Sequence, residues 1–197
     1  MRLKRLATIF LLLMSFPAFA RPDFQTPSDR CKFVTTANLS DPEAPRFDSY
    51  PVLTEEKVSN PKLDLSSNPI AKRYRTVLRY QVSEGANFAG HYRVAIWGCG
   101  MTCAMFAVVN LKTGQVITPK RASTVFGIHL AADDFLPNAE TGGWGFRYTT
   151  RSNLLVLVGM LDEDESRDGA FYFALQNEKL IPIHSTIVKK NCENVNP

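Results

Sequence analysis

Two cysteines near the middle of the chain, Cys99 and Cys103, are the residues whose type and spacing come closest to a reactive site, such as a redox-active dithiol. They form a CxxxC pair, whereas redox-active dithiols commonly have two intervening residues at a helix N-terminus, where the dipole lowers the thiol pKa. Here the pair lies between two strand-like apolar runs, and no basic residue follows within five positions. The sequence favours a structural disulfide. A redox-active pair is the alternative and, because no histidine lies at ligand spacing, a metal site is a remoter one.

The histidines are the other side chains suited to acid–base chemistry, and none belongs to an HExxH motif: His91, His129 and His184. On a strand, His91, Arg93 and Trp97 would share one face, because successive side chains point to opposite sides. The opposite face, which has the composition of a core, would carry Tyr92, Val94 and Ile96. The first face is most simply an ordinary half-exposed sheet surface. A recognition strip is the sharper hypothesis, and a catalytic His91 is a third.

A second tryptophan, Trp144, lies among glycines in the segment Gly142–Gly145. Its ring would either pack into the core or enter a partner's cleft, since interface hot spots are rich in Trp, Tyr and Arg. Trp97, Trp144 and Tyr148 would also suit a glycan or another small ligand. The predicted binding residues are His91, Arg93, Trp97, Trp144 and Tyr148.

Other catalytic and metal motifs are incomplete. The chain has no GxSxG nucleophile elbow, and cysteines held in a disulfide cannot form a Cys–His pair. In the acidic run Asp162–Gly169, Arg167 and Phe173 stand where an EF-hand calcium loop needs Gly and Glu. That run is predicted to be a solvated hairpin loop, with a calcium site or a docking site for a basic partner as alternatives. No catalytic residue, metal or cofactor is predicted; enzymatic activity stays uncertain and is disfavoured.

The first 20 residues have the pattern of a secretory signal peptide: a basic start, a short apolar run, and a small-x-small triplet that ends at Ala20. A membrane anchor is the alternative, but the apolar run is shorter than the roughly 20 residues that span a bilayer. We therefore expect cleavage after Ala20, a periplasmic or secreted protein, and no membrane span.

Without this leader the chain is almost neutral. Three of the 23 basic residues lie in it, which leaves 20 basic residues against 19 acidic ones. A nucleic-acid partner would require a strong basic surface, so none is expected.

Export also bears on the cysteines, because oxidising compartments maintain disulfides. Four cysteines allow three pairings, which the sequence alone does not distinguish. The pairing that we favour is Cys99 with Cys103, and Cys31 with Cys192.

The elements expected to position these residues begin after a proline-rich segment. Residues 21–69 contain seven of the 12 prolines and are predicted to wrap a single globular domain, residues 70–197, so that 21–197 fold as one unit. Asn68 and Pro69 then indicate a helix start, and Ile70, Tyr74, Val77 and Leu78 follow one helical face, with Gly85 at the end. A strand is the alternative for this stretch.

Short strand-like runs joined by turns make up the rest of the chain. They are His91–Trp97, Cys103–Leu111, Gln115–Thr118, Val125–Leu130, Gly145–Thr149, Leu154–Leu161, Ala170–Leu175 and Lys179–Ile187. This spacing predicts an antiparallel, meander-like sheet. The expected class is α+β, mostly antiparallel β, built as a sandwich or half-open barrel with one helix ahead of the sheet.

Three segments together resemble a family of small exported bacterial proteins of unassigned activity. They are Asn87–Tyr92 (NFAGHY), Trp97–Gly100 with Cys103, and Asn110–Gly114 (NLKTG). The resemblance covers about 30 residues well and the flanking elements loosely. It implies homology and brings no catalytic residue or cofactor.

The function favoured by the sequence is a non-enzymatic binding module whose partner is another protein of the cell envelope or an incoming protein. It would act in the manner of a hydrolase inhibitor or an immunity protein. One alternative is a periplasmic enzyme, either a thiol–disulfide oxidoreductase or an envelope hydrolase that uses His91. The other is a domain that binds glycans or small molecules.

Overall fold

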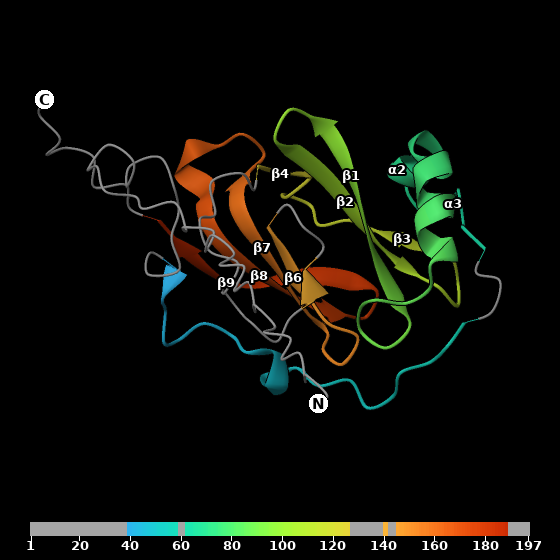
Figure 1. The fold of residues 1–197 in the computed structure, drawn as a ribbon, viewed down its shortest axis with the longest axis horizontal. Helices are drawn as coiled ribbons and strands as arrows, with labels where there is room; N and C mark the ends of the chain where they lie inside the picture. The colour runs from blue at the N-terminus through green and yellow to red at the C-terminus, as the bar shows by residue number, and fades with distance from the viewer. Residues whose placement is uncertain (1–38, 59–61, 127–139, 142–144, 189–197) are drawn as a thin grey trace, which may run out of the picture.

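The computed structural model describes residues 39–58, 62–126, 140–141 and 145–188. Within them nine strands form one sheet whose neighbouring strands are all antiparallel, and two short helices precede it (Figure 1). The predicted mostly antiparallel α+β class is therefore confirmed. Several predicted features lie outside the described residues: the leader Met1–Ala20, Cys31, His129, Trp144 and Cys192.

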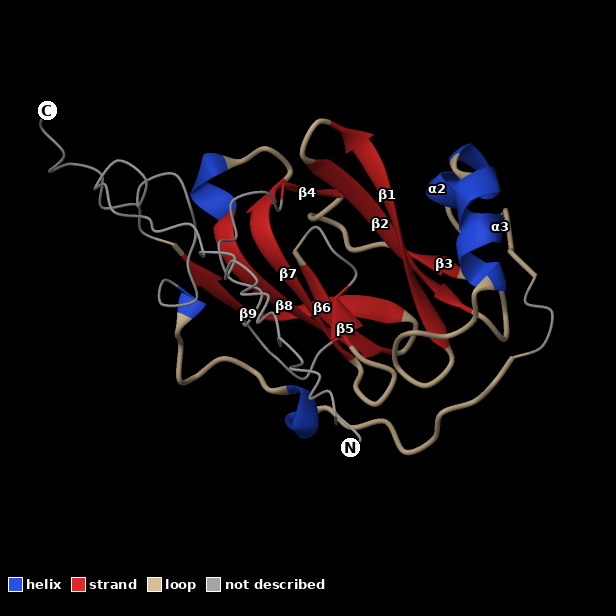
Figure 2. Ribbon diagram, viewed as in Figure 1, coloured by secondary structure: helices blue, strands red, loops and turns tan. Residues whose placement is uncertain are grey.

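The strands form the bulk of the fold, as the colouring by secondary structure shows (Figure 2). Their bounds are β1 Tyr92–Gly100, β2 Cys103–Asn110, β3 Val116–Ile117, β4 Thr124–Phe126, β5 Glu140–Thr141, β6 Phe146–Tyr148, β7 Leu154–Leu161, β8 Asp168–Gln176 and β9 Lys179–Ile187. The order of paired strands is β1-β2-β4-β7-β6-β5, with β3 on β2, β8 on β7, and β9 on β8.

The sheet curls around its own inner face. A single apolar cluster takes Val94 from β1, Phe106 from β2, Leu157 from β7, Phe171 from β8 and Leu180 from β9. Because β1 and β9, which each pair with a single neighbouring strand, reach the same core, the sheet is an open sheet bent toward a barrel, which was one of the two predicted architectures.

The expected helix is present in two segments, α2 Pro69–Arg73 and α3 Arg75–Ser83, which meet at Tyr74. The Asn68 side chain accepts a hydrogen bond from the Ile70 N–H at 2.9 Å, the capping role that its position before proline predicted. Both helices bury side chains against the outer face of β1 and β2, in a second cluster with Leu78, Ala95 and Val109.

Residues 39–58 and 62–68, here called the strap, run along the outside of the domain (Figure 1). Apart from the short 3₁₀ helix η2 Phe47–Ser49 and the single 3₁₀ residue Leu39, they form no helix or extended strand. Leu39 packs on the outer face of β7 and β8, in a third cluster with Tyr172. Asp41 accepts hydrogen bonds from Thr186 and pairs with His184 of β9, each at 2.8 Å, so the strap is attached to β9 by its side chains.

Two glycines of the NFAGHY and NLKTG segments let the strap pass close to the sheet. A Cβ on Gly90 would lie 2.5 Å from the Thr54 carbonyl oxygen, and one on Gly114 would lie 2.0 Å from that of Lys62. Both glycines have positive φ, of 80° and 81° respectively. These two glycines are therefore explained by the packing of the strap.

Candidate functional site

A groove of about 1090 Å³ lies between β9 and the segment that contains β3 and leads into β4. Its first wall is residues 178–185, and its opposite wall is residues 115–121. Phe171 and Phe173 of β8 form the apolar floor. Such a volume is at the upper limit of the roughly 300–1,000 Å³ found for small-molecule pockets, so the groove has room for a larger, elongated ligand.

Side-chain contacts bridge the groove at both ends. At one end the Glu178 carboxylate, in the β8–β9 turn, accepts hydrogen bonds from the Tyr92 hydroxyl at 2.7 Å and the Asn110 amide at 2.9 Å. At the other end the Arg167 guanidinium donates to the Arg121 carbonyl oxygen at 2.6 Å. Glu178 thus ties the first wall to β1 and β2, and Arg167 ties the opposite wall to the segment before β8. The groove between the walls is a gap in the curled sheet.

The backbone of β9 presents one edge to this gap. Asn177 and Glu178 have φ of 48° and 57° and form a two-residue turn between the paired residues Gln176 and Lys179. Gln176 and Lys179, which flank the turn, form a hydrogen-bonded pair, and hydrogen-bonded and non-hydrogen-bonded pairs alternate from there along the two strands. Leu180 therefore belongs to a non-hydrogen-bonded pair, and its N–H and C=O point away from β8. The register shifts at a bulge opposite Tyr172 and Phe173. Beyond the bulge, the Val188 N–H donates to the Asp168 carbonyl, so Val188 belongs to a hydrogen-bonded pair. By the same alternation, the N–H and C=O of Ile187 and of Ser185 point away from β8.

The corresponding edges of β1 and β3 are capped by side chains. Asn87 both accepts from the Val94 N–H, at 2.7 Å, and donates to the Val94 carbonyl, at 3.2 Å, in the way that a neighbouring strand would. Gln81 of α3 donates to the Ile96 carbonyl at 3.3 Å. On β3, the Val116 N–H donates to the Ser67 hydroxyl at 3.0 Å. These caps block further strand pairing at both edges.

Among the described residues, no such cap covers the outer edge of β9. Within residues 39–58, 62–126, 140–141 and 145–188, β9 pairs with β8 alone, and no hydrogen bond reaches the N–H of Leu180 or Ser185 from the groove side. Pro182 removes one donor from this edge, as is common in edge strands, but it leaves the carbonyl groups as acceptors. The strand edge and the apolar floor thus face the same gap.

The rim of the groove carries more positive than negative charge. Lys120, Arg121 and Lys179 are exposed and make no ion pair with any residue that the structure describes. The two acidic residues of the lining, Glu178 and Asp164, accept hydrogen bonds from neutral donors and keep their negative charge, so the three exposed cations exceed them by one. The electrostatic preference of the rim is therefore for an acidic ligand.

Burial is the main cause of a raised Tyr92 pKa, and the hydrogen bond to Glu178 and its negative charge add to the effect. The Tyr92 hydroxyl therefore remains a donor to Glu178 throughout the neutral range. The second Glu178 carboxylate oxygen is buried and has no hydrogen-bond partner among the described residues.

The sequence-predicted binding residues lie elsewhere, because none of His91, Arg93, Trp97 or Tyr148 lines the groove. The row expected on β1 is covered by the helices and is not an open strip. The Arg93 side chain is only 13% exposed and pairs with Glu84 at the end of α3. Trp97 packs on Tyr74, with ring centroids 4.9 Å apart.

The remaining predicted residues are separated from this row. Tyr148 is buried, and its hydroxyl lies 3.3 Å from the Asn87 amide. His91 is partly buried, with its ring 4.4 Å from that of Tyr92. Burial and the nearby Lys112 cation lower the His91 pKa, so its ring is neutral at pH 7. Binding by these residues stays a prediction. The opposite face of β1 is as predicted, because Val94, Tyr92 and Ile96 pack on the inner core.

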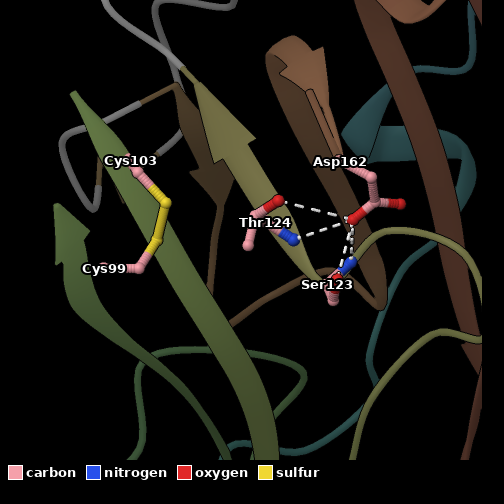
Figure 3. Close-up of a disulfide and its surroundings, with 5 residues drawn as sticks. All are labelled: Cys99, Cys103, Ser123, Thr124 and Asp162. Carbon is pink, nitrogen blue, oxygen red and sulfur yellow. Dashed lines mark hydrogen bonds between the residues drawn. A yellow bond between two sulfur atoms is a disulfide. The ribbon is translucent and has the colours of Figure 1, made fainter. Parts of the chain in front are cut away.

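The predicted Cys99–Cys103 disulfide is present and joins the two strands of the β1–β2 hairpin (Figure 3). The neighbouring strand β4 pairs with β2 through Ala104 and Met105. Just before β4, Ser123 donates through its N–H to the carboxylate of Asp162 at 2.7 Å. The disulfide thus braces the hairpin tip on one side of β4 while Asp162 anchors the other.

The acidic run Asp162–Gly169 begins as a short turn that includes the 3₁₀ helix η3 Glu165–Arg167, and its last two residues, Asp168 and Gly169, start β8. Asp164 caps that helix by accepting from the Ser166 N–H at 3.0 Å, and Arg167 pairs with Asp162 at 3.0 Å. Among the described residues, no group of three or more His, Cys, Asp or Glu side chains is arranged to hold a metal ion.

In the part of the chain that the structure describes, no helix has the length and hydropathy that crossing a membrane requires. The groove was not predicted from the sequence, although Pro182 inside a strand-like run indicated that β9 lies at an edge of the sheet.

No protein-family model, curated protein or solved structure matches the chain.

Proposed function

We propose that this protein is an exported, non-enzymatic module that binds another protein through the groove beside β9. The partner is a protein of the cell envelope or one that enters it, and binding has an inhibitory or neutralising role. Export is supported by the leader-like pattern of residues 1–20 and by the Cys99–Cys103 disulfide, which oxidising compartments preserve.

The observation that carries the proposal is an uncapped strand edge beside an apolar floor. Exposed strand edges promote pairing with other chains, and natural proteins usually protect them. Here the edges of β1 and β3 are protected by Asn87, Gln81 and Ser67, whereas the edge of β9 faces the groove. Protection of the edges of β1 and β3, but not of the edge of β9, supports a binding role for β9.

The test compares two isoleucines of the same strand. Ile181 lines the groove and is 38% exposed, and Ile187 is 44% exposed but does not line it. Purified wild-type protein, I181D and I187D are immobilised and exposed to a periplasmic extract, and the captured proteins are identified by mass spectrometry. We expect a partner that wild type and I187D capture equally and that I181D captures at least about tenfold less.

Circular dichroism and thermal melting of the three proteins provide the control, because both changes are at partly exposed positions of one edge strand. If I181D folds and captures the partner as well as I187D does, the groove is not the binding site. If no protein is captured by folded wild type under any growth condition tested, the proposed function is wrong.

A further inference from the structure

We propose that the segment of the partner that enters the groove is an extended, acidic strand that pairs with the free edge of β9. The inference rests on the proposed function and specifies how that function is carried out. Its three supports are the backbone groups of β9, the apolar floor and the charge of the rim.

The backbone groups select an extended ligand. Leu180, Ser185 and Ile187 direct N–H and C=O groups away from β8, and Pro182 adds one acceptor. A strand added to a sheet edge gains affinity from main-chain hydrogen bonds, whereas a helix satisfies its own backbone groups. Residues 178–185 form one wall of the groove, a length that matches a paired segment of roughly six to eight residues.

The floor selects the side chains on one face of that strand. Successive side chains of a strand point to opposite faces, so every second residue of the ligand would face Phe171 and Phe173. Leu180, Ile117 and Pro182 complete an apolar lining around these rings. Alternate positions of the ligand are therefore expected to be apolar.

The rim selects the remaining side chains. Lys120 and Arg121 stand on the wall opposite β9, and Lys179 stands at the start of β9 itself. All three are exposed and have no ion-pair partner in the described part of the chain. Because these three cations outnumber the two carboxylates of the lining, Glu178 and Asp164, the rim complements Asp or Glu in a ligand.

A nucleic acid would be an unsuitable ligand for the same site. Bases bind proteins by stacking on exposed aromatic faces, and Phe171 and Phe173 are only 7% and 5% exposed. An acidic polypeptide satisfies the cationic rim and, in addition, the row of backbone groups on β9.

The experiment is a selection from a phage-displayed library of random ten-residue peptides on the purified protein. We expect enrichment of sequences in which Asp or Glu alternates with apolar residues. The affinities of selected synthetic peptides are then measured by fluorescence anisotropy against wild type and two charge-reversal variants. The groove variant carries K120E, R121E and K179E, and the control carries K72E, R75E and R79E, on the exposed side of the helices.

We expect the groove variant to bind about tenfold more weakly and the control to bind within about twofold of wild type, since the net charge changes equally in both. Methylation of alternate backbone nitrogens of the peptide should abolish binding, because it removes the donors of a β pairing. Both controls separate strand addition at this edge from general attraction to positive charge.

Three outcomes would overturn the inference. They are a selection that yields basic, helical or no enriched peptides; equal weakening by the two charge-reversal variants; and undiminished binding of the methylated peptide. If capture of the natural partner still depends on Ile181 in that case, the proposed function stands and only the acidic strand is wrong. If capture is also unaffected by I181D, both fail.

Discussion

The Glu178 carboxylate accepts a hydrogen bond from the Tyr92 hydroxyl at 2.7 Å and so ties the β8–β9 turn to the first strand of the sheet. The Asn110 amide donates to the same oxygen at 2.9 Å. A single side chain therefore connects the strand that forms one wall of the groove with β1 and β2, 68 or more residues away in sequence. The position of β9 depends on this contact as well as on its pairing with β8.

Removal of the Glu178 carboxylate should destabilise the fold. In E178A the partly buried Tyr92 hydroxyl and the buried Asn110 amide lose their acceptor, and we expect the free energy of unfolding to fall by about 2 kcal/mol. E178Q keeps the accepting oxygen and should lose less than about 1 kcal/mol. It should also lower the Tyr92 pKa, because the negative charge beside the hydroxyl is removed. Urea unfolding and ultraviolet titration of tyrosine measure the two effects.

Glu163 provides the control for E178A. It has a φ of 59°, close to the 57° of Glu178, and its side chain is exposed. E163A should therefore change the unfolding free energy by less than about 0.5 kcal/mol. Equal losses in E163A and E178A would mean that backbone conformation, and not the contact with Tyr92, explains the effect.

Replacement of Gly114 by alanine should be more damaging than replacement of Gly85. Both glycines have φ above 80°, which costs an alanine roughly 1–2 kcal/mol in either case. At Gly85 an added Cβ meets nothing within 4 Å, but at Gly114 it would lie 2.0 Å from the Lys62 carbonyl oxygen. We expect G114A to lose at least about 2 kcal/mol more than G85A in urea unfolding. Similar losses would show that the strap is not held against this turn.

Loss of the Cys99–Cys103 disulfide should cost about 2 kcal/mol, because the closed loop is short and its removal restores little entropy to the unfolded chain. The measurement is the unfolding free energy of the C99S/C103S double variant without reductant. Thiol titration of that variant under denaturing conditions reports the other two cysteines. No reactive thiol is expected if Cys31 pairs with Cys192, and two reactive thiols would refute that pairing.

Asp162 should make stability depend on pH in the acid range. Burial acts to raise the pKa of Asp162, but hydrogen bonds from Ser123 and Thr124 and from Arg167 outweigh it and hold the pKa below its ordinary 3.8. Since the folded pKa is the lower one, this stabilisation is complete above about pH 4 and is lost as the pH falls through the folded value. Other carboxylates with lowered pKa values, such as Asp41, contribute in the same direction.

The D162N variant isolates this contribution. We expect it to be less stable than wild type at pH 7 and to lose less stability than wild type between pH 5 and pH 2, as measured by urea unfolding at each pH. E163Q, at the exposed neighbouring position, should follow the wild-type curve. Parallel curves for D162N and wild type would exclude Asp162 as a source of the acid dependence.

Local sequence patterns predicted the elements of this fold well. β7 occupies the predicted range Leu154–Leu161, because a continuous apolar run between turn residues suits a strand buried on both faces. The helix start at Asn68 was also predicted, since capping is set by neighbouring residues. The break of the helix at Tyr74 was not indicated by any local signal.

The site could not be predicted in the same way, because it depends on long-range packing. Alternation correctly put Arg93 and Trp97 on one face of β1, but it carried no information that α3 would cover that face. The groove exists because β9 pairs with β8 alone and β3 is short. Neither fact follows from the apolar pattern of Lys179–Ile187.

Hydrogen exchange at the β9 edge tests the central claim most directly. With the captured partner, or a selected peptide, bound to the isotopically labelled protein, the amides of Leu180 and Ser185 should exchange at least about tenfold more slowly than in the free protein. The Val94 amide, already bonded to Asn87, should be unchanged. Unaltered exchange at Leu180 and Ser185 in a saturated complex would contradict strand pairing at β9.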